Sequence, residues 1–358
     1  MIKAADFLAR QPIPIIQAPM LGASSFGMAL AVSAAGGLGS IASAGSSPEE
    51  IVADAARMRA ATDAPFAMNL FVLGKAAPDV GEVTAAIARL APWRAELGLA
   101  EPSAPNDFAP DFEAQFAGLI RAAPPVASFA FDILSVAQVA ALHAVGTLVF
   151  GTATTVAEAR AWEAAGADAV VLQGFEAGGH RGHFLAPVER SLVGTLALVR
   201  AARNAVALPL IAAGGIMDGA GVAAALALGA SAAQMGTAFL LADETAISPA
   251  WRDAVAHVGD DATALTRAFS GRHARGIENR FMREMRPVEN EVPAYPVQNR
   301  LTKELRAAAA KAGEADMLSL WAGQAATLAR EGASGDLVRQ WWAEAKAAGA
   351  ALGERLRG

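Results

Sequence analysis

Short apolar segments alternate with longer segments of helical character along the first two thirds of the chain. We predict strands at the apolar segments, which are 13–17, 38–42, 66–71, 126–131, 147–152, 168–173, 209–215 and 232–236. Helices are predicted between them, at 25–36, 46–61, 80–97, 135–144, 155–166, 189–204 and 218–229. Most of the apolar segments do not alternate with polar positions, which is typical of strands in a parallel sheet covered on both faces.

A strand followed by a helix, repeated eight times, predicts an α/β fold of the (β/α)8 TIM barrel type. A doubly wound open sheet is the alternative. Such a sheet normally carries a G-x-G-x-x-G turn after its first strand, and QAPMLGASSFG (17–27) does not match that turn. The segment 72–125 is proline-rich and less regular, and the sequence does not say which part of it covers the barrel.

The pattern changes after about residue 240, where charge and proline increase and the strand–helix repeat ends. We therefore predict a barrel over 1–242 and a second, smaller α+β domain over 243–317 that lies towards the substrate. An alanine-rich helical segment, 318–358, is expected to return to the barrel.

Charge and composition narrow the classes of function. The chain of 358 residues carries a net charge of −6 and has no block of Lys and Arg, so a nucleic-acid partner is not expected. It has no cysteine, which excludes disulfides, thiolate catalysis and thiolate-held metal. No His, Asp and Glu set has the spacing of metal ligands, so no metal is expected either.

The N-terminal segment does not show the apolar core of a secretory signal. The uncharged segment from Gln11 to Pro48 is interrupted by prolines and glycines, so it is too broken to span a membrane. We expect a cytoplasmic protein that does not insert into a membrane.

Glycine-rich turns follow the last two predicted strands, at AAGGI (212–216) and QMGT (234–237). Backbone N–H groups without neighbouring side chains can point at phosphate oxygens, and these two loops form the usual phosphate site of such barrels. A purely structural glycine turn is the alternative for each loop alone. Asp218 is expected to cap the following helix instead of contacting a ligand.

Amide side chains stand at four predicted strand ends, at Gln17, Asn69, Gln173 and Gln234. Amides both donate and accept hydrogen bonds, so they suit a ring with N–H and C=O groups such as an isoalloxazine. Each of them could instead bind the backbone of its own loop.

His180 lies in the loop QGFEAGGHRG (173–182), between glycine and arginine, directly after a predicted core strand. An imidazole in a short strand-end loop can accept a proton or bind an anion near neutral pH, so His180 is the candidate for catalysis. His183 is a weaker candidate. Glu176 and Arg181 could bind a ligand, pair with each other or cap the loop.

Three further positions could line the site. The basic segment SGRHARG (270–276) could fold over the barrel mouth and favour an anion, or could be a solvated patch. Tyr295 and Lys303 belong to the segment YPVQNRLTK and could face the substrate, although Tyr295 could also simply pack.

An ordered set of motifs resembles the nitronate monooxygenase family, formerly called 2-nitropropane dioxygenases. Along the chain, the motifs are PIIQAPM, MNLF, QGFEAGGHRG, PLIAAGGI, GASAAQMGTAFL, SGRHARG, YPVQNRLT and WAGQ (321–324). The resemblance spans nearly the whole chain, and the form EAGGHRG is similar to the class I branch. It implies a barrel that binds FMN non-covalently, with the second domain over the flavin.

The resemblance also implies roles for individual residues. His180 corresponds to the catalytic histidine, and Tyr295 and Lys303 to substrate-binding positions. Asn299 stands where some members carry another tyrosine, which leaves the shape of the substrate open. The implied flavin-contact positions are Ala18, Pro19, Met20, Asn69, Gln173, Gly178, Gly179, Ala213, Gly214, Gly215, Gln234, Met235, Gly236 and Thr237.

The reaction implied is the oxidation of alkyl nitronates, such as propionate 3-nitronate, by O₂ to a carbonyl compound and nitrite, through a flavin semiquinone. His180 would position the nitronate anion or remove the α-proton of a neutral nitroalkane. An NAD(P)H-dependent FMN reductase for quinones or enoyl groups is the alternative on the same fold, and a non-catalytic flavin-binding module is the second. The sequence allows a homodimer without requiring one.

Overall fold

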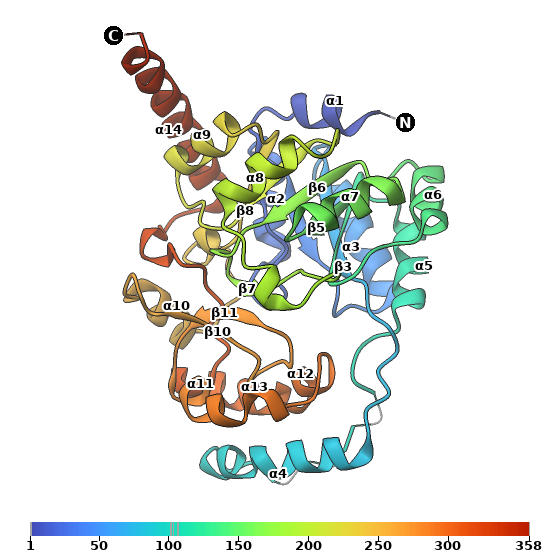
Figure 1. The fold of residues 1–358 in the computed structure, drawn as a ribbon, viewed down its shortest axis with the longest axis vertical. Helices are drawn as coiled ribbons and strands as arrows, with labels where there is room; N and C mark the ends of the chain where they lie inside the picture. The colour runs from blue at the N-terminus through green and yellow to red at the C-terminus, as the bar shows by residue number, and fades with distance from the viewer. Residues whose placement is uncertain (1, 101, 103, 106, 358) are drawn as a thin grey trace.

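The computed structural model describes residues 2–100, 102, 104–105 and 107–357, and its central feature is a barrel of eight parallel strands (Figure 1). The strands are β1 (Ile15–Gln17), β2 (Gly39–Ala42), β3 (Phe66–Phe71), β4 (Val126–Ala130), β5 (Leu148–Ala153), β6 (Ala169–Gln173), β8 (Leu210–Ala213) and β9 (Ala232–Met235). Their order is β1-β9-β8-β6-β5-β4-β3-β2, and a parallel bridge between Ile16 and Leu38 joins the two ends of the sheet. The predicted (β/α)8 barrel is confirmed.

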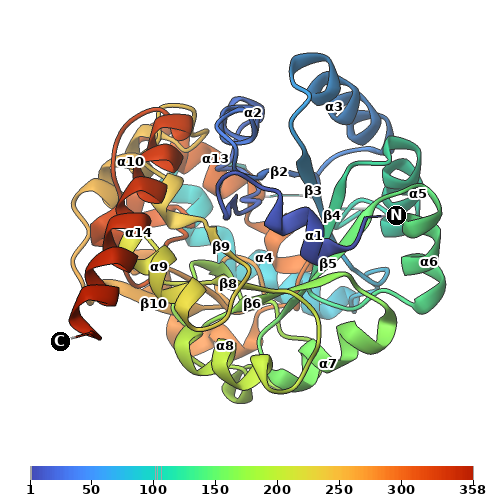
Figure 2. The same ribbon diagram turned by 90° about the horizontal axis from the view of Figure 1, so that it is seen from above.

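Helices surround the barrel, as Figure 2 shows from above. They are α2 (Phe26–Ala34), α3 (Pro48–Ala61), α5 (Phe112–Ala122), α6 (Val136–Ala144), α7 (Val156–Ala165), α8 (Thr195–Arg203) and α9 (Gly219–Ala227). Their starts follow local chemistry: Ser47 and Glu50 form a capping box at the start of α3, with Pro48 in its first turn. Asp218 accepts a hydrogen bond from the N–H of Gly221, so its predicted capping role is confirmed.

The amino-terminal end of the barrel is closed by α1 (Ala4–Ala9). Phe7 and Leu8 of this helix are buried against apolar residues that point into the barrel, among them Ile16 and Phe150. Since this end is filled with side chains, a ligand can enter only from the carboxyl ends of the strands.

Several predicted element boundaries are wrong, and two of them have a clear local cause. The strand predicted over 209–215 ends at Ala213, because Gly214 and Gly215 have φ values of 113° and 72°, which a strand cannot accommodate. The helix predicted over 189–204 begins only at Thr195, because the carboxylate of Glu176 accepts the Thr195 N–H and starts the helix there.

A second hydrophobic cluster lies beyond the carboxyl ends of the barrel strands. It includes side chains of α10 (Pro249–Ala256), α11 (Arg280–Met285), α12 (Val297–Leu301) and α13 (Lys303–Ala312). A small antiparallel sheet of β10 (Thr263–Thr266), β11 (Ala274–Ile277) and β7 (Gly179–His180) lies beside it. The short 3-10 helices are η1 (Val188–Arg190), η2 (Thr237–Phe239), η3 (Arg286–Glu291), η4 (Ala315–Met317) and η5 (Ala326–Leu328).

The helix α4 (Val80–Glu96) comes from the first third of the chain but packs into this second cluster. Figure 1 shows it below α11 and α13, far from the barrel helices that neighbour it in sequence. The Trp93 and Phe281 rings are 4.8 Å apart, edge to face. The division into 1–242 and 243–317 stays a prediction, and the second cluster draws on both ranges.

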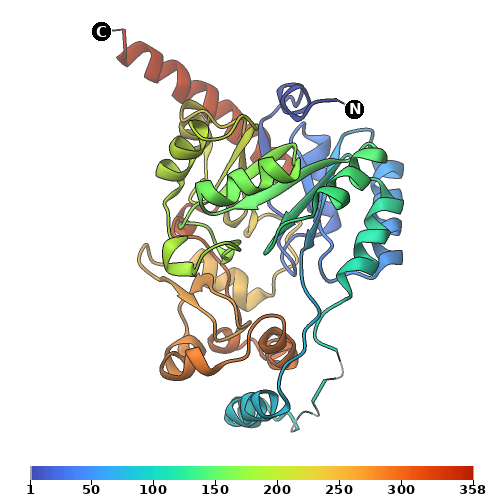
Figure 3. The ribbon, with the colours of Figure 1, turned by 45° about the vertical axis from the view of Figure 1, so that its right-hand side comes forward.

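The last helix, α14 (Ser334–Arg355), packs along the barrel. Trp341 is fully buried, with its ring 5.0 Å from that of Phe239, while the carboxyl-terminal turns project away from the molecule (Figure 3). Among the residues that the structure describes, no helix is both long and apolar enough to cross a membrane. The cytoplasmic location remains a prediction.

Candidate active site

A cavity of about 860 Å³ opens at the carboxyl ends of the barrel strands, between the barrel and the second cluster. This volume lies within the range of known small-molecule sites, which is roughly 300–1,000 Å³. Most of the predicted site residues line it, namely Ala18, Pro19, Met20, Asn69, Gln173, Gly178, Gly179, His180, Ala213, Gly214, Gly215, Gln234, Gly236, Thr237, Tyr295 and Lys303. Met235 is the exception: its side chain is 1% exposed and packs in the barrel core, while its carbonyl accepts the Ala18 N–H.

The two glycine turns after β8 and β9 form one end of the cavity. Gly214 and Gly215 both have positive φ, so a side chain there would strain the backbone. A Cβ on Gly236 would lie 3.4 Å from Ala18 and from the sulfur of Met20. Backbone strain therefore disfavours a side chain at Gly214 and Gly215, whereas a Cβ at Gly236 would make only ordinary contacts. The three glycines leave bare backbone that a phosphate group could approach closely.

The amide side chains at the strand ends have different tasks. Gln17 is fully buried, accepts from the Ser40 N–H and donates to the Ala18 carbonyl, so it binds backbone and does not face the cavity. Asn69 donates from Nδ2 to the Ser128 carbonyl at 3.0 Å, which leaves its Oδ1 open towards the cavity. Gln234 lines the cavity, and its side-chain amide has no hydrogen-bond partner within the described ranges.

Gln173 holds the loop that carries His180. Its Oε1 accepts from the Gly182 N–H at 2.8 Å, and its Nε2 donates to the His180 carbonyl at 2.9 Å. One amide therefore joins the end of β6 to the backbone of His180 and of Gly182. The second hydrogen of Nε2 remains available to a ligand.

Arg181 and Glu176 shape the same loop and do not pair with each other. Arg181 is fully buried and donates to the carbonyls of Gly174 and Ser191 at 2.6 and 2.7 Å. Glu176 accepts from both the N–H and the hydroxyl of Thr195. Of the alternatives for these two residues, loop capping is confirmed.

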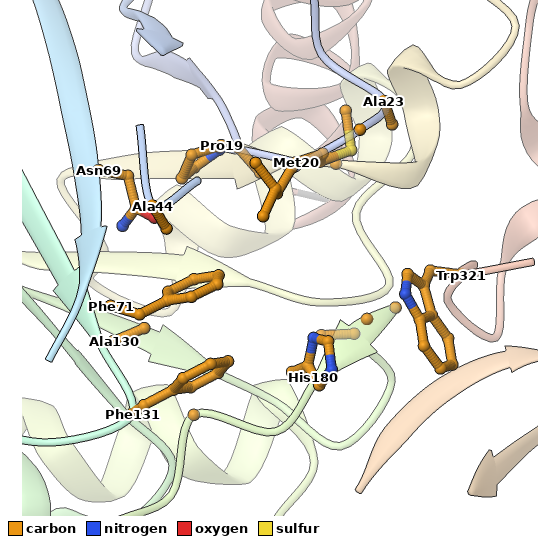
Figure 4. Close-up of a pocket in the computed structure, with 18 of the residues that line it drawn as sticks. Pro19, Met20, Ala23, Ala44, Asn69, Phe71, Ala130, Phe131, His180 and Trp321 are labelled. Atoms are coloured by element: carbon orange, nitrogen blue, oxygen red, sulfur yellow. The ribbon is translucent and has the colours of Figure 1, made fainter. Parts of the chain in front are cut away.

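His180 lies where the barrel meets the small sheet. Its strand, β7, pairs with β11, so that His180 is opposite Ala274. The side chain projects into the cavity between Phe131 and Trp321, with Met20 across the space (Figure 4). The His180 ring lies 5.4–5.5 Å from the rings of Phe131, Tyr295 and Trp321.

The electrostatics of this position keep the imidazole neutral. Burial, and after it the positive charges of Arg272 and Arg306, lower the pKa of His180 to about 3. The Nε2 atom is 2.9 Å from the hydroxyl of Ser270, and Nδ1 has no hydrogen-bond partner among the described residues. The neutral ring therefore has one nitrogen in contact with the Ser270 hydroxyl and one nitrogen without a hydrogen-bond partner in the described residues.

His183 is placed differently and does not line the cavity. Burial and the charge of Arg272 lower the pKa of His183 to about 4, and its buried Nδ1 lacks a partner among the described residues. Its backbone carbonyl accepts from Arg272. His183 therefore belongs to the loop after β7 and does not contact the cavity.

Basic side chains gather on the cavity wall formed by the second cluster. Arg300, Lys303 and Arg306 line the cavity, and within the described ranges none of them forms an ion pair. Arg306 donates to the carbonyl and the Oδ1 of Asn299, both at 2.9 Å. Unpaired cations in a cavity favour an anionic ligand.

The segment 270–276 lies against the loop that carries His180. Arg272 donates to the Arg181 carbonyl at 2.9 Å, and its guanidinium lies 4.4 Å from the centre of the Phe131 ring. The segment is therefore packed against the site and is not the solvated patch that was the alternative.

Several residues of the cavity were not predicted as site residues from sequence. Phe71 and Phe131 stack at 4.2 Å, and Phe131 has a φ of 83°, which is rare outside glycine. Their position as the last residues of two predicted strands was an available signal, because strand ends meet at the active-site face. Arg306 carried no such local signal, since only folding brings it to the barrel.

The fold and the cavity define an α/β-barrel enzyme whose site is completed by a second group of helices. Known proteins refine this class. The family model for nitronate monooxygenase matches residues 5–344. The nitronate monooxygenase of Pseudomonas aeruginosa is 46% identical over 330 residues, which cover 91% of this chain and 94% of that protein.

Solved structures agree with this relationship. Nitroalkane oxidase from Streptomyces ansochromogenes is 42% identical, with a TM-score of 0.90 over 97% of this chain and 99% of that one. FabK from Thermotoga maritima is more distant, at 29% identity and a TM-score of 0.75, over 100% of this chain and 99% of that one. The chain belongs to the nitronate monooxygenase family, and it is an oxidoreductase.

Proposed function

We propose that this protein oxidises alkyl nitronates, such as propionate 3-nitronate, with O₂ to a carbonyl compound and nitrite, using non-covalently bound FMN. The main support for the proposal is that three kinds of group line the same cavity. Bare glycine turns lie at one end, open amide groups lie between, and a neutral histidine faces unpaired cations. Family membership supports nitronate oxidation in general.

The residues present fit FMN. Gly214 and Gly215 leave room where a Cβ would strain the backbone, and Gly236 adds bare backbone after β9, which suits a phosphate. Asn69, Gln173 and Gln234 have hydrogen-bonding capacity left for the polar edge of an isoalloxazine. Bound FMN would supply the electron acceptor for the nitronate and the reductant for O₂.

The side chains of this protein would bind and orient the substrate. Lys303 and Arg300 provide positive charge for a nitronate and for a carboxylate on the same molecule. Burial raises the pKa of Tyr295 to about 12, so its phenol stays protonated and can donate to an anion. The rings of Phe71, Phe131 and Trp321 keep water away from the reacting atoms.

An assay of oxygen consumption and nitrite release with propionate 3-nitronate tests the proposal directly. We expect purified protein loaded with FMN to consume O₂ and release nitrite. Anaerobic NADH is the discriminating addition, because rapid bleaching of the flavin together with absent nitronate turnover would instead support an FMN reductase. Protein that takes up no FMN would contradict both enzymatic functions.

A further inference from the structure

Ser270 makes the only hydrogen bond to the imidazole of His180 within the described part of the chain. It lies in the middle of the β10–β11 connection, 90 residues from His180 in sequence, and is 1% exposed. Its hydroxyl oxygen is 2.9 Å from Nε2 of His180 and 3.0 Å from the carbonyl oxygen of Arg272.

A hydroxyl group has one hydrogen, so these two contacts cannot both receive it. The Arg272 carbonyl can only accept, and the contact between them therefore uses the serine hydrogen. Ser270 is then the acceptor for His180, and Nε2 must carry the imidazole hydrogen. The opposite arrangement would leave the Arg272 carbonyl and an Nδ1–H group without partners among the described residues.

The charges around the ring favour the same arrangement. Arg272 and Arg306 lie close enough to His180 to disfavour added positive charge on it, and the phenol of Tyr295 is neutral. A lone pair facing this positive potential is more stable than an N–H group facing it. We propose that Ser270 is a positioning residue that holds His180 as the Nε2–H tautomer, so that the lone pair of Nδ1 serves the substrate cavity.

The consequence for chemistry rests on the proposed function. With a neutral nitroalkane, the Cα–H bond breaks and its electron pair forms the C=N bond of the nitronate, while the π pair of an N=O bond moves onto the nitro oxygen and the proton goes to Nδ1. The resulting imidazolium keeps its Nε2–H bond to Ser270. A substrate supplied as a nitronate has no such proton to lose, so Ser270 matters chiefly for neutral substrates.

Holoenzyme labelled with [¹⁵N]histidine tests the tautomer by NMR, with His180→Asn to assign the signal. We expect the proton on Nε2 in the wild type, and a shift of population towards Nδ1–H in Ser270→Ala. A wild-type proton on Nδ1, or an unchanged tautomer in Ser270→Ala, would overturn the proposal. If Ser270→Ala does not fold, Ser270→Cys replaces it, because a thiol is only a weak hydrogen-bond acceptor and the same shift of tautomer is expected.

Ser33→Ala is the matched control. Ser33 is also 1% exposed, donates to a carbonyl at 2.9 Å and accepts an N–H, but it lies on α2 away from the cavity. It should not change the tautomer of His180. If Ser33→Ala loses its hydroxyl without changing the tautomer of His180, the effect of Ser270→Ala reflects positioning of the imidazole and not a general loss of protein stability.

Turnover provides a second readout. In Ser270→Ala we expect kcat/KM for a neutral nitroalkane to fall roughly tenfold, with preformed nitronates nearly unaffected, as suits the loss of one hydrogen bond. Equal losses for both substrates would contradict the positioning role. The NMR result does not depend on activity, so an inactive protein with an Nε2–H histidine would disprove the proposed function alone.

Discussion

His180 is held by contacts from distant parts of the chain. Gln173 fixes its backbone from the barrel, and Ser270 and the charge of Arg272 act on its ring from the second group of elements. Its pKa of about 3 means that its ring is neutral near neutral pH. At the scale of the residue, the His180 ring can therefore accept a proton or a hydrogen bond, and it does not carry a permanent positive charge.

Replacing His180 with Asn tests the base role. We expect kcat/KM for a neutral nitroalkane to fall by about 100-fold or more, the usual contribution of a general base. Preformed nitronates should lose much less, because no proton has to be removed. Oxygen uptake with both forms measures the ratio, and equal retention of activity would disprove proton abstraction by His180.

Lys303→Ala tests recognition of the anion. Lys303 lines the cavity without an ion pair in the described structure, so its removal should raise KM for propionate 3-nitronate roughly tenfold, with a smaller effect on kcat. Lys311→Ala on the same helix, outside the cavity, is the control and should leave KM unchanged. If both variants raise KM alike, Lys303 acts only through the overall positive electrostatic potential of the protein and not by binding the anion in the cavity.

At the scale of elements, the β6–β7 loop depends on close backbone packing. A Cβ at Gly178 would lie 2.6 Å from backbone atoms of Ala322 and Gly323, which cannot move as a side-chain end can. The strand β7 then continues into the small sheet. The loop, the sheet and the segment 321–324 therefore hold each other in place.

Gly178→Ala should therefore weaken both the fold and the site. We expect a loss of about 1–3 kcal/mol in the free energy of unfolding, as for other overpacked positions, together with weaker FMN retention. Urea unfolding and flavin titration measure the two effects. Gly349→Ala in α14, where nothing lies within 4 Å of the added Cβ, should be neutral or slightly stabilising.

At the scale of the whole molecule, three histidines link folding to pH. Burial is the first cause that lowers the pKa of His180, His183 and His273 below the ordinary value of 6.5. The unfolded chain therefore binds protons near pH 6.5, where the folded chain does not. Their contribution to stability is complete above that pH and is lost progressively as the pH falls, towards the folded-state pKa of about 4 for His183 and about 3 for His180.

The free energy of unfolding should consequently decrease between pH 7.5 and pH 5. His183→Asn, which removes a histidine outside the cavity, should make this decrease shallower in urea titrations at the two pH values. An equal slope in wild type and His183→Asn would contradict the role of His183.

The sequence alone determined the barrel, the glycine turns and His180 as the candidate for catalysis. These features are local: burial on both faces appears as unbroken apolar segments, and left-handed turns select glycine. The strand predicted at 66–71 coincides with β3 for this reason.

Only the tertiary structure decided what surrounds His180. The pairing of β7 with β11, the approach of Ser270 across 90 residues and the place of α4 in the second cluster depend on contacts distant in sequence. Neither periodicity nor turn chemistry encodes such contacts. Burial and charge set the protonation of His180, and both arise only when the two groups of elements pack together.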